Sequence, residues 1–204
     1  MEEFINQSTS ITLPPGFEED KSYPLIIALH WGLDNYPGVN RDFMAGFIEP
    51  AFDGLGAILA APMRRELDWT DASNEAVIME VIAELQRTYP INTGQILLTG
   101  YSMGGIGSWA VGSRHQDTFT GILPISAQPP AGVLEFDWQV PLYVIHSQQD
   151  EYFPFRDVQT IVDELKQQGA DISWHPLTNG THFDTGSFIS AVQASHPWIR
   201  SMWQ

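Results

Sequence analysis

The sequence has no cysteine and few basic residues, and these two shortages exclude several kinds of protein. Without cysteine the chain can form no disulfide, no cysteine-ligated zinc or iron–sulfur site and no cysteine nucleophile. Lys and Arg number 9 against 25 Asp and Glu, so the formal net charge is -16. A chain this acidic binds phosphate backbones and anionic lipids poorly, and we therefore expect neither a nucleic acid nor a membrane as a partner.

Long apolar runs are missing as well. No run approaches the roughly 18–20 residues of a membrane span, and the first residues, MEEFINQSTS, lack the basic and apolar start of a signal peptide. The compartment stays open between the cytoplasm, a mature secreted protein and a domain of a longer chain. No glycine-rich phosphate loop or paired histidine ligands are visible, so we expect no metal and no cofactor. The oligomeric state is also left open.

The length and composition are those of a globular protein, with 204 residues of which 43% are hydrophobic. They predict one domain over residues 1–204. Short apolar runs recur along it, at residues 24–30, 56–62, 95–99, 120–125, 140–146 and 172–177. These runs are nearly continuous in apolar character rather than alternating, which is typical of strands buried on both faces of a parallel sheet.

Segments with helical spacing separate the apolar runs. The clearest covers residues 74–89, where five aliphatic side chains form one stripe and Pro90 ends it. Further helices are expected over residues 41–52, 158–168 and 187–203, the last interrupted near Pro197. This alternation predicts an α/β fold with a mostly parallel sheet of about six or seven strands, helices on both faces and an antiparallel edge strand at residues 8–13.

One short motif carries chemistry. Residues 100–104 read G-x-S-x-G around Ser102, after an apolar strand and before a segment that can form a helix. The serine then sits at a sharp turn, where side chains two residues before and after it would strike neighbouring backbone, so Gly100 and Gly104 have a physical reason. The motif predicts Ser102 as a nucleophile, and a glycine-rich turn with an incidental serine is the plainer alternative.

A serine nucleophile needs a base, and the base needs an orienting acid; this motif predicts the chain order Ser, acid, His. The histidines that follow Ser102 are His115, His146, His175, His182 and His196. His115 falls at the end of the helix after the motif, His146 and His175 fall inside strands, and His196 precedes Pro197. Only His182 lies in a loop after the last strand, and we predict it as the base.

The acid is expected at the carboxyl end of the strand at residues 140–146, where Asp150 follows. Glu151 and Asp184 are its rivals. Asp184 is too near His182 in sequence to orient it easily, and Glu151 should point elsewhere from the same turn. We predict Asp150 as the acid, with a solvated or helix-capping aspartate as the alternative.

Two N–H donors should face the oxyanion that develops during acyl transfer. One is expected from Met103, directly after the nucleophile. The other is expected from the loop after the first central strand, whose sequence is HWGLD at residues 30–34.

Taken together, these motifs resemble the α/β-hydrolase superfamily, and within it the small, lidless phospholipase/carboxylesterase and dienelactone-hydrolase-like esterases. The likeness starts at LPPGFEEDKSYPLIIALHWG and continues through GYSMGG, HSQQDEYFP and NGTHFD. It implies an α/β-hydrolase fold without a cap domain, with Ser102 as nucleophile, Asp150 as acid and His182 as base. The dienelactone hydrolases proper resemble a cysteine-nucleophile site, which this chain cannot form.

The likeness departs from the family at the oxyanion loop. Such proteins commonly have a His-Gly-x-Gly sequence there, whereas this chain has Trp31 at a usual glycine position, followed by Gly32. In the same frame the second donor is Gly32, which we favour. A loop one residue shorter would make it Trp31.

No insertion of cap size interrupts the expected strands, so an open, shallow cleft is expected. Trp31, Trp69, Tyr101 and Tyr152 fall on carboxyl-end loops that can line it, with rim packing as the alternative for Trp69 and Tyr152. We predict a serine carboxylesterase that hydrolyses short-chain carboxylic esters of small molecules through an acyl-enzyme. A feruloyl-type esterase, a thioesterase or a peptidase can use the same triad, whereas a non-catalytic binding module would normally lose one of its members.

Overall fold

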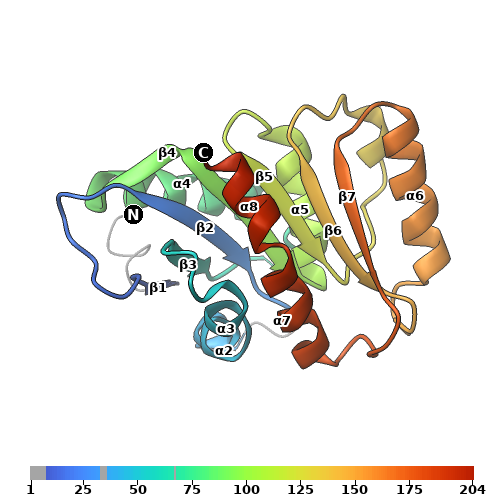
Figure 1. Cartoon of the computed structure of the whole chain (residues 1–204), viewed down its shortest axis with the longest axis horizontal. Helices are drawn as coiled ribbons and strands as arrows, with labels where there is room; N and C mark the ends of the chain where they lie inside the picture. Colours follow the sequence, from blue (N-terminus) through green and yellow to red (C-terminus); the bar gives the residue numbers. More distant parts are fainter. Residues whose placement is uncertain (1–7, 33–35, 67) are drawn as a thin grey trace.

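A seven-stranded sheet runs through the computed structural model, which describes residues 8–32, 36–66 and 68–204 (Figure 1). The strand order is β1-β3-β2-β4-β5-β6-β7. The edge strand β1 pairs with β3 antiparallel, and every other neighbouring pair is parallel. The mostly parallel sheet and its antiparallel edge are confirmed, and no cap domain stands over the sheet in the described part of the chain.

Each of the six apolar runs overlaps one strand from β2 to β7, although β4 begins four residues before its run, and β1 lies in the expected edge segment. The strands are β1 (Thr9–Thr12), β2 (Tyr23–Leu29), β3 (Ile58–Pro62), β4 (Ile91–Tyr101), β5 (Gly121–Ile125), β6 (Leu142–Ser147) and β7 (Ile172–Leu177). In β2, Leu25 and Ile27 belong to the core on one face of the sheet, and Ile26 and Ala28 to the core on the other. Both sets are fully buried, which is why the run is apolar at every position.

Helices cover both faces. Around one core lie α4 (Ala72–Thr88), α5 (Met103–Arg114) and α6 (Phe155–Gln167), with the short η2 (Val133–Glu135). Around the other lie α2 (Val39–Phe43), η1 (Met44–Ile48), α3 (Glu49–Phe52), α7 (Thr185–Ala194) and α8 (His196–Met202). The expected helix over residues 41–52 is thus three consecutive short helices with a π-helical middle. The expected helix over residues 187–203 is divided at Ser195, two residues before Pro197.

The parallel arrangement brings the carboxyl ends of β2, β4, β5, β6 and β7 to one edge of the sheet. The loops that leave these ends carry His30–Gly32, Ser102, Ser126, Asp150 and His182, and such an edge is where open α/β sheets bind ligands. In the sequence these residues are spread over 150 positions, so the topology assembles the site.

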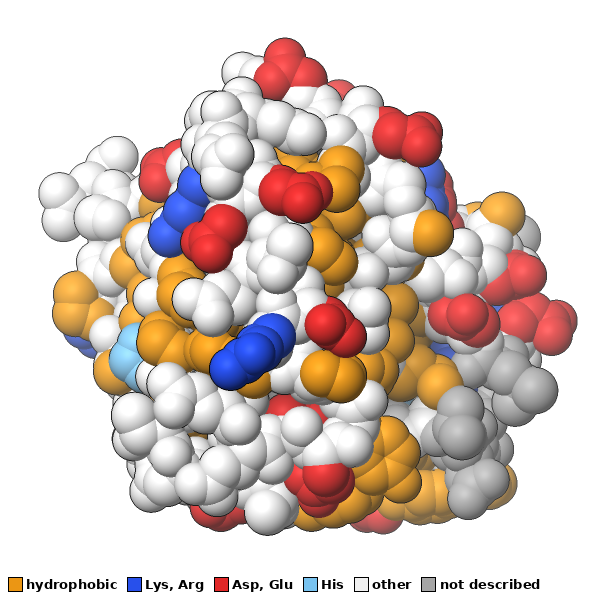
Figure 2. Space-filling view, turned by 90° about the vertical axis from the view of Figure 1, so that its right-hand side faces the viewer, with side chains coloured by type: hydrophobic (Ala, Val, Ile, Leu, Met, Phe, Trp, Pro, Cys, Tyr) orange, Lys and Arg blue, Asp and Glu red, His pale blue; other side chains and the backbone are white. Residues whose placement is uncertain are grey.

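The surface reflects the composition. On the face over α6 and β7 (Figure 2), acidic side chains are scattered among neutral and apolar ones, and the basic side chains stand apart from one another. Among the described residues, no helix has the length and apolar character that crossing a membrane requires.

Candidate active site

The nucleophile turn lies between β4 and α5. Ser102 has φ 57° and ψ -117°, a strained conformation for a residue with a side chain. A Cβ on Gly100 would lie 2.2 Å from the carbonyl oxygen of Gly104, and one on Gly104 would lie 1.9 Å from that of Leu29. Both glycines are therefore required by close backbone packing, as the motif predicts. The turn presents Ser102 at the start of α5, whose first N–H groups have no partner within the helix.

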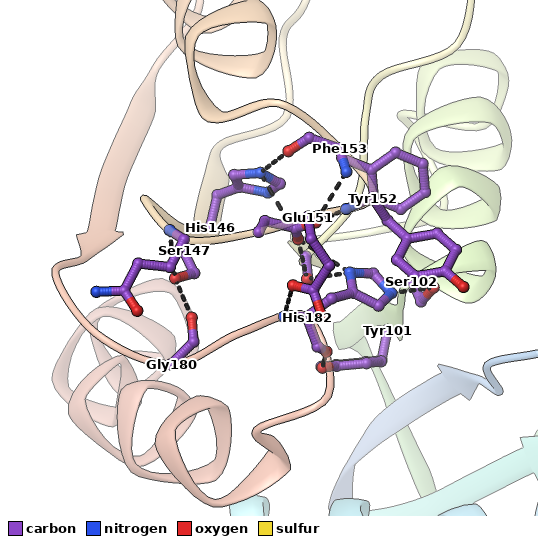
Figure 3. A network of polar contacts seen from close by, with 12 residues as sticks. Tyr101, Ser102, His146, Ser147, Glu151, Tyr152, Phe153, Gly180 and His182 are labelled. Atoms are coloured by element: carbon purple, nitrogen blue, oxygen red, sulfur yellow. Dashed lines mark hydrogen bonds and ion pairs between the residues drawn. The ribbon is translucent and has the colours of Figure 1, made fainter.

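The structure brings the three predicted residues together from three separate loops. Ser102 Oγ donates a hydrogen bond to Nε2 of His182 over 2.8 Å (Figure 3). On the other side of the ring, Nδ1 of His182 donates to Oδ2 of Asp150 over 2.9 Å. This is the geometry that a base and an orienting acid need to activate a hydroxyl. Asp150 and His182 are both buried.

Asp150 is held as a carboxylate. Its Oδ1 accepts the backbone N–H groups of Tyr152 and Phe153 at 2.9 and 2.8 Å. Burial by itself raises the pKa of Asp150, but the hydrogen bonds from His182, Phe153 and Ser126 outweigh it and lower the pKa to about 2. The negative charge of Asp150 therefore stays beside Nδ1 of His182.

Ser126 is a fourth member of the network that the sequence analysis did not identify. Its hydroxyl donates to Oδ2 of Asp150 over 2.6 Å, and its oxygen lies 3.0 Å from Nδ1 of His182, where it can accept. It directly follows β5, and its φ of 48° is left-handed. The available signal was positional, since Ser126 ends the strand that pairs with β4 beside the nucleophile turn.

Two further side chains hold the backbone of His182. Its N–H donates to Oε2 of Glu151 over 2.8 Å, and its carbonyl accepts from the hydroxyl of Tyr101. Burial, followed by the nearby charge of Asp150, raises the pKa of Tyr101, so the phenol remains a donor. Glu151 thus has a role at the backbone of His182 that the sequence analysis did not identify. Tyr101 lines the cleft and also anchors the loop of the base.

The loop after β2 is arranged by a buried histidine. Nδ1 of His30 lies 3.0 Å from the carbonyl oxygen of Trp31, to which it donates. In a trans peptide the C=O and the following N–H point in opposite directions, so the N–H of Gly32 points away from His30. Gly32 has φ 83° and lines the cleft together with Trp31 and Met103. Residues 33–35, which continue the expected loop, lie outside the described residues.

Trp69 corrects the expectation that it lines the cleft. Its side chain is 0% exposed, and its Nε1 donates over 2.9 Å to the carbonyl oxygen of His30. The two rings also meet edge to face, with centroids 5.1 Å apart. An indole N–H needs a partner when it is buried, and the carbonyl that ends β2 supplies one. From its place in the core, Trp69 therefore stabilises the start of the loop that carries Trp31 and Gly32.

His146 lies close to the acid but in the core. Its Nε2 donates to the carbonyl oxygen of Phe153 over 2.9 Å and lies 3.8 Å from Oδ2 of Asp150. Burial lowers the pKa of His146, so the ring is neutral and steadies the turn after β6. Of the remaining histidines, His115 pairs with Glu75, His175 contacts the Tyr143 hydroxyl, and His196 contacts the backbone carbonyl of Ala51.

The assembled residues open into a cleft of about 600 Å³. Its walls are mostly apolar and aromatic, and its lining includes Trp31, Tyr101, Tyr152, Phe153 and Phe183. No described residue of the lining carries a carboxylate, an ammonium or a guanidinium. The described residues contain no group of three or more acidic or histidine side chains that could hold a metal ion.

In a comparison with protein families, residues 61–194 match the model described as the dienelactone hydrolase family. Among curated proteins, the chain is 25% identical over 163 residues to the "Probable feruloyl esterase C" of Aspergillus flavus, covering 76% of this chain and 59% of that protein. It is 22% identical over 149 residues to the "Bifunctional acetylxylan esterase/xylanase XynS20E" of Neocallimastix patriciarum, covering 71% of this chain and 22% of that protein. The chain thus spans between about a fifth and three fifths of these relatives.

Solved structures share the fold. The structure titled "Crystal Structure of a Thermostable Esterase" superposes with a TM-score of 0.77 over 95% of this chain and 58% of the other, at 20% identity. The shared fold therefore extends over nearly the whole chain.

Proposed function

The chain belongs to the dienelactone hydrolase family, and on that premise we propose that it is a serine carboxylesterase which cleaves short-chain esters through an acyl-enzyme. The observation that carries the proposal is the pair of hydrogen bonds from Ser102 to His182 and from His182 to Asp150, at 2.8 and 2.9 Å. The titles of the relatives, which name feruloyl and acetylxylan esterases, support an ester as the substrate.

In the first half of the reaction, Ser102 Oγ attacks the ester carbonyl carbon while its proton passes to Nε2 of His182. The carbonyl oxygen becomes an oxyanion, and Asp150 stabilises the imidazolium. His182 then gives the proton to the alcohol oxygen as the carbon–oxygen bond breaks. The alcohol leaves, and the acyl group remains on Ser102.

In the second half, water replaces the alcohol. His182 takes a proton from the water as its oxygen attacks the acyl carbon, and a second oxyanion forms. When this collapses, the proton returns to Ser102 and the carboxylic acid leaves. His182 is the base in both halves, so the rates of both depend on the orientation of its imidazole ring.

We assign the oxyanion donors to the N–H groups of Met103 and Gly32. Met103 is the first residue of α5, where N–H groups lack helical partners. The carbonyl of Trp31 is taken by His30, which turns the next N–H, that of Gly32, toward the opposite side. This supports Gly32 over Trp31 as the second donor.

We base the expected preference for short acyl chains on the open rim of the cleft. A long acyl chain that extends beyond the cleft lies partly in water and gains less per methylene than the roughly 0.8 kcal/mol of full burial. We expect the fastest hydrolysis for acyl chains of about two to six carbons. The aromatic walls of the cleft also favour a second candidate, a feruloyl-type esterase, because flat acyl groups pack well on such walls.

The test measures kcat/KM for p-nitrophenyl esters from acetate to palmitate, with methyl ferulate as an additional substrate. Ser102→Ala should lose on the order of 10⁴-fold in kcat, because no neighbouring group replaces the nucleophile. A folded Ser102→Ala protein that keeps more than about a hundredth of the wild-type rate contradicts the assignment. A maximum at twelve carbons or more contradicts the short-chain preference, and methyl ferulate as the best substrate favours the second candidate.

A further inference from the structure

Two exposed aromatic side chains stand together at the rim of the cleft. Tyr152 and Phe183 are 63% and 66% exposed, although large apolar side chains are mostly buried elsewhere in the described chain. Their ring centroids are 5.4 Å apart, and the rings meet at 88°, so they form an apolar corner that is open to solvent. We call this pair the aromatic corner. Exposed apolar surface that is gathered beside a cleft is typical of a ligand-binding site.

The aromatic corner is built around the base. The ring of His182 lies 5.0 Å from that of Tyr152 and 5.3 Å from that of Phe183, measured between centroids. Figure 3 shows Tyr152 beside the imidazole, on the loop that also carries Glu151. The two aromatic residues come from the loops after β6 and β7, whereas Gly32 and Met103 come from the loop after β2 and the start of α5.

The reaction defines which part of the ester lies on that side. His182 must give its proton to the alcohol oxygen, so this oxygen comes within hydrogen-bond distance of Nε2. The acyl oxygen instead faces the N–H groups of Met103 and Gly32. The alcohol part of the substrate therefore leaves the site past His182, where Tyr152 and Phe183 stand.

The charges nearby limit the kind of alcohol. Glu151 and Asp184 adjoin Tyr152 and Phe183 in sequence and are exposed, and the charges of both act on Tyr101 in the lining of the same cleft. The chain as a whole carries a formal charge of -16. An anionic alcohol would be repelled, while a neutral ring gains contact with the faces of the two aromatic side chains.

We propose that Tyr152 and Phe183 form a subsite for the leaving alcohol, and that it takes a neutral ring, either an aryl group or a sugar. The proposal rests on the esterase function proposed above and adds the substrate class on the alcohol side. The subsite acts by holding the ring while the ester carbonyl lies against Ser102, so it raises kcat/KM for esters of ring-bearing alcohols.

The test compares acetates, so that the acyl group is constant. Ethyl acetate is the reference, and benzyl acetate and methyl 6-O-acetylglucopyranoside carry an aryl and a sugar ring on primary alcohols. The quantity measured is the ratio of kcat/KM for each ring ester to that for ethyl acetate. In Tyr152→Ala and in Phe183→Ala this ratio should fall roughly 3- to 10-fold, the worth of one aromatic contact. Phe183→Leu, which keeps apolar bulk without a flat face, should show part of the fall.

The matched control is Tyr36→Ala, because Tyr36 is another exposed tyrosine (44%) and does not belong to the cleft lining. Its ratios should equal those of the wild type. A fall for only one ring ester supports the subsite and identifies the ring that it takes. Unchanged ratios in both corner variants overturn the subsite and leave the esterase function standing. A wild-type protein that hydrolyses none of the acetates, nor the p-nitrophenyl esters, overturns the esterase function and the subsite with it. Faster hydrolysis of 4-carboxybenzyl acetate than of benzyl acetate overturns the restriction to neutral rings.

Discussion

The loop that carries His182 and the loop that carries Gly32 serve the same reaction in the proposed mechanism, but they are held in different ways. His182 is held at its ring by Asp150 and Ser126 and at its backbone by Glu151 and Tyr101. The Gly32 loop is held by bonds from two buried neutral side chains, His30 and Trp69. The first loop therefore depends on ionised carboxylates, and the second on a histidine whose burial favours the neutral ring.

Because of this difference, the two loops should respond differently as the pH falls. The pKa of Asp150 is about 2, so its carboxylate keeps the bond to His182 in mildly acidic solution. Burial lowers the pKa of His30 to about 4, partly opposed by its bond to Trp31 and assisted by the charge of Arg64. Acid should thus disturb the oxyanion side of the site well before it removes the charge of Asp150.

Asp150 and Glu151 both contact His182, and the larger loss of activity is expected from Asp150→Asn. Asparagine keeps the shape but can hold the imidazole in the wrong tautomer, and kcat should fall about 10³- to 10⁴-fold. Glu151→Gln should lose less than about tenfold, since an amide oxygen still accepts the N–H of His182. Steady-state kinetics on p-nitrophenyl acetate measures both. Equal losses in the two variants would mean that the acid has been misassigned.

The pH dependence of stability tests the part that His30 plays in the Gly32 loop. The unfolded chain takes up a proton on His30 below about pH 6.5, whereas the folded protein does so only near pH 4. Stability is therefore full above about pH 6.5 and is lost as the pH falls to 4, by up to about 3 kcal/mol for this group. Burial lowers the pKa of His146, His175 and His196 too, and these act in the same direction.

Urea unfolding between pH 7 and pH 4 measures this loss. His30→Asn offers an N–H donor that cannot titrate, so its stability should fall less steeply over the same range. If the variant and the wild type show the same slope, the titration of His30 does not control the stability of this region. The pKa of Asp150 is lowered too, so its contribution has the same direction at lower pH, being present above about pH 4 and lost toward pH 2.

A smaller effect is expected from Ser126→Ala. The variant removes the donor to Asp150 and an acceptor near His182, but it leaves the direct bond between these two in place. We expect kcat to fall about tenfold with KM nearly unchanged, the worth of one hydrogen bond to a charged group. Ser113→Ala removes another buried serine hydroxyl, which donates to a carbonyl within α5, and serves as the control. Equal kcat in Ser126→Ala and Ser113→Ala would mean that the hydroxyl of Ser126 does not contribute to the reaction rate.

The smallest effect is expected from Trp69→Phe. The change keeps a buried aromatic ring but removes part of the indole, including the N–H that donates to the carbonyl oxygen of His30. Loss of one neutral hydrogen bond of about 1 kcal/mol should lower kcat roughly fivefold by loosening the loop of Gly32. Trp109→Phe is the control, since Trp109 is a fully buried tryptophan in the body of α5. An unchanged kcat in Trp69→Phe would show that the loop keeps its shape without that bond.

The alternation of buried strands and helices was readable from the sequence because each run obeys its own local rule. Strands covered on both faces are apolar at every position, and helices repeat their apolar residues along one stripe. The nucleophile turn was also readable, since the clashes at Gly100 and Gly104 arise from backbone within a few residues and from the neighbouring strand. Asp150 and His182 followed from chain order and from their places after strands, and their roles stay predictions.

Only the tertiary structure decided what Trp69, Ser126 and Glu151 do. Trp69 is aromatic like the residues of the cleft, yet it lies in the core, where its N–H donates to the carbonyl oxygen of His30, 39 positions away. Ser126 lies 24 residues from Asp150 and 56 from His182, and Glu151 lies 31 from His182. Contacts at such separations depend on which strands are neighbours and where each ends, and no local pattern encodes that. The sequence by itself determined the strands and helices and predicted the candidate residues Ser102, Asp150 and His182, whereas the strand order decided which polar side chains contact them.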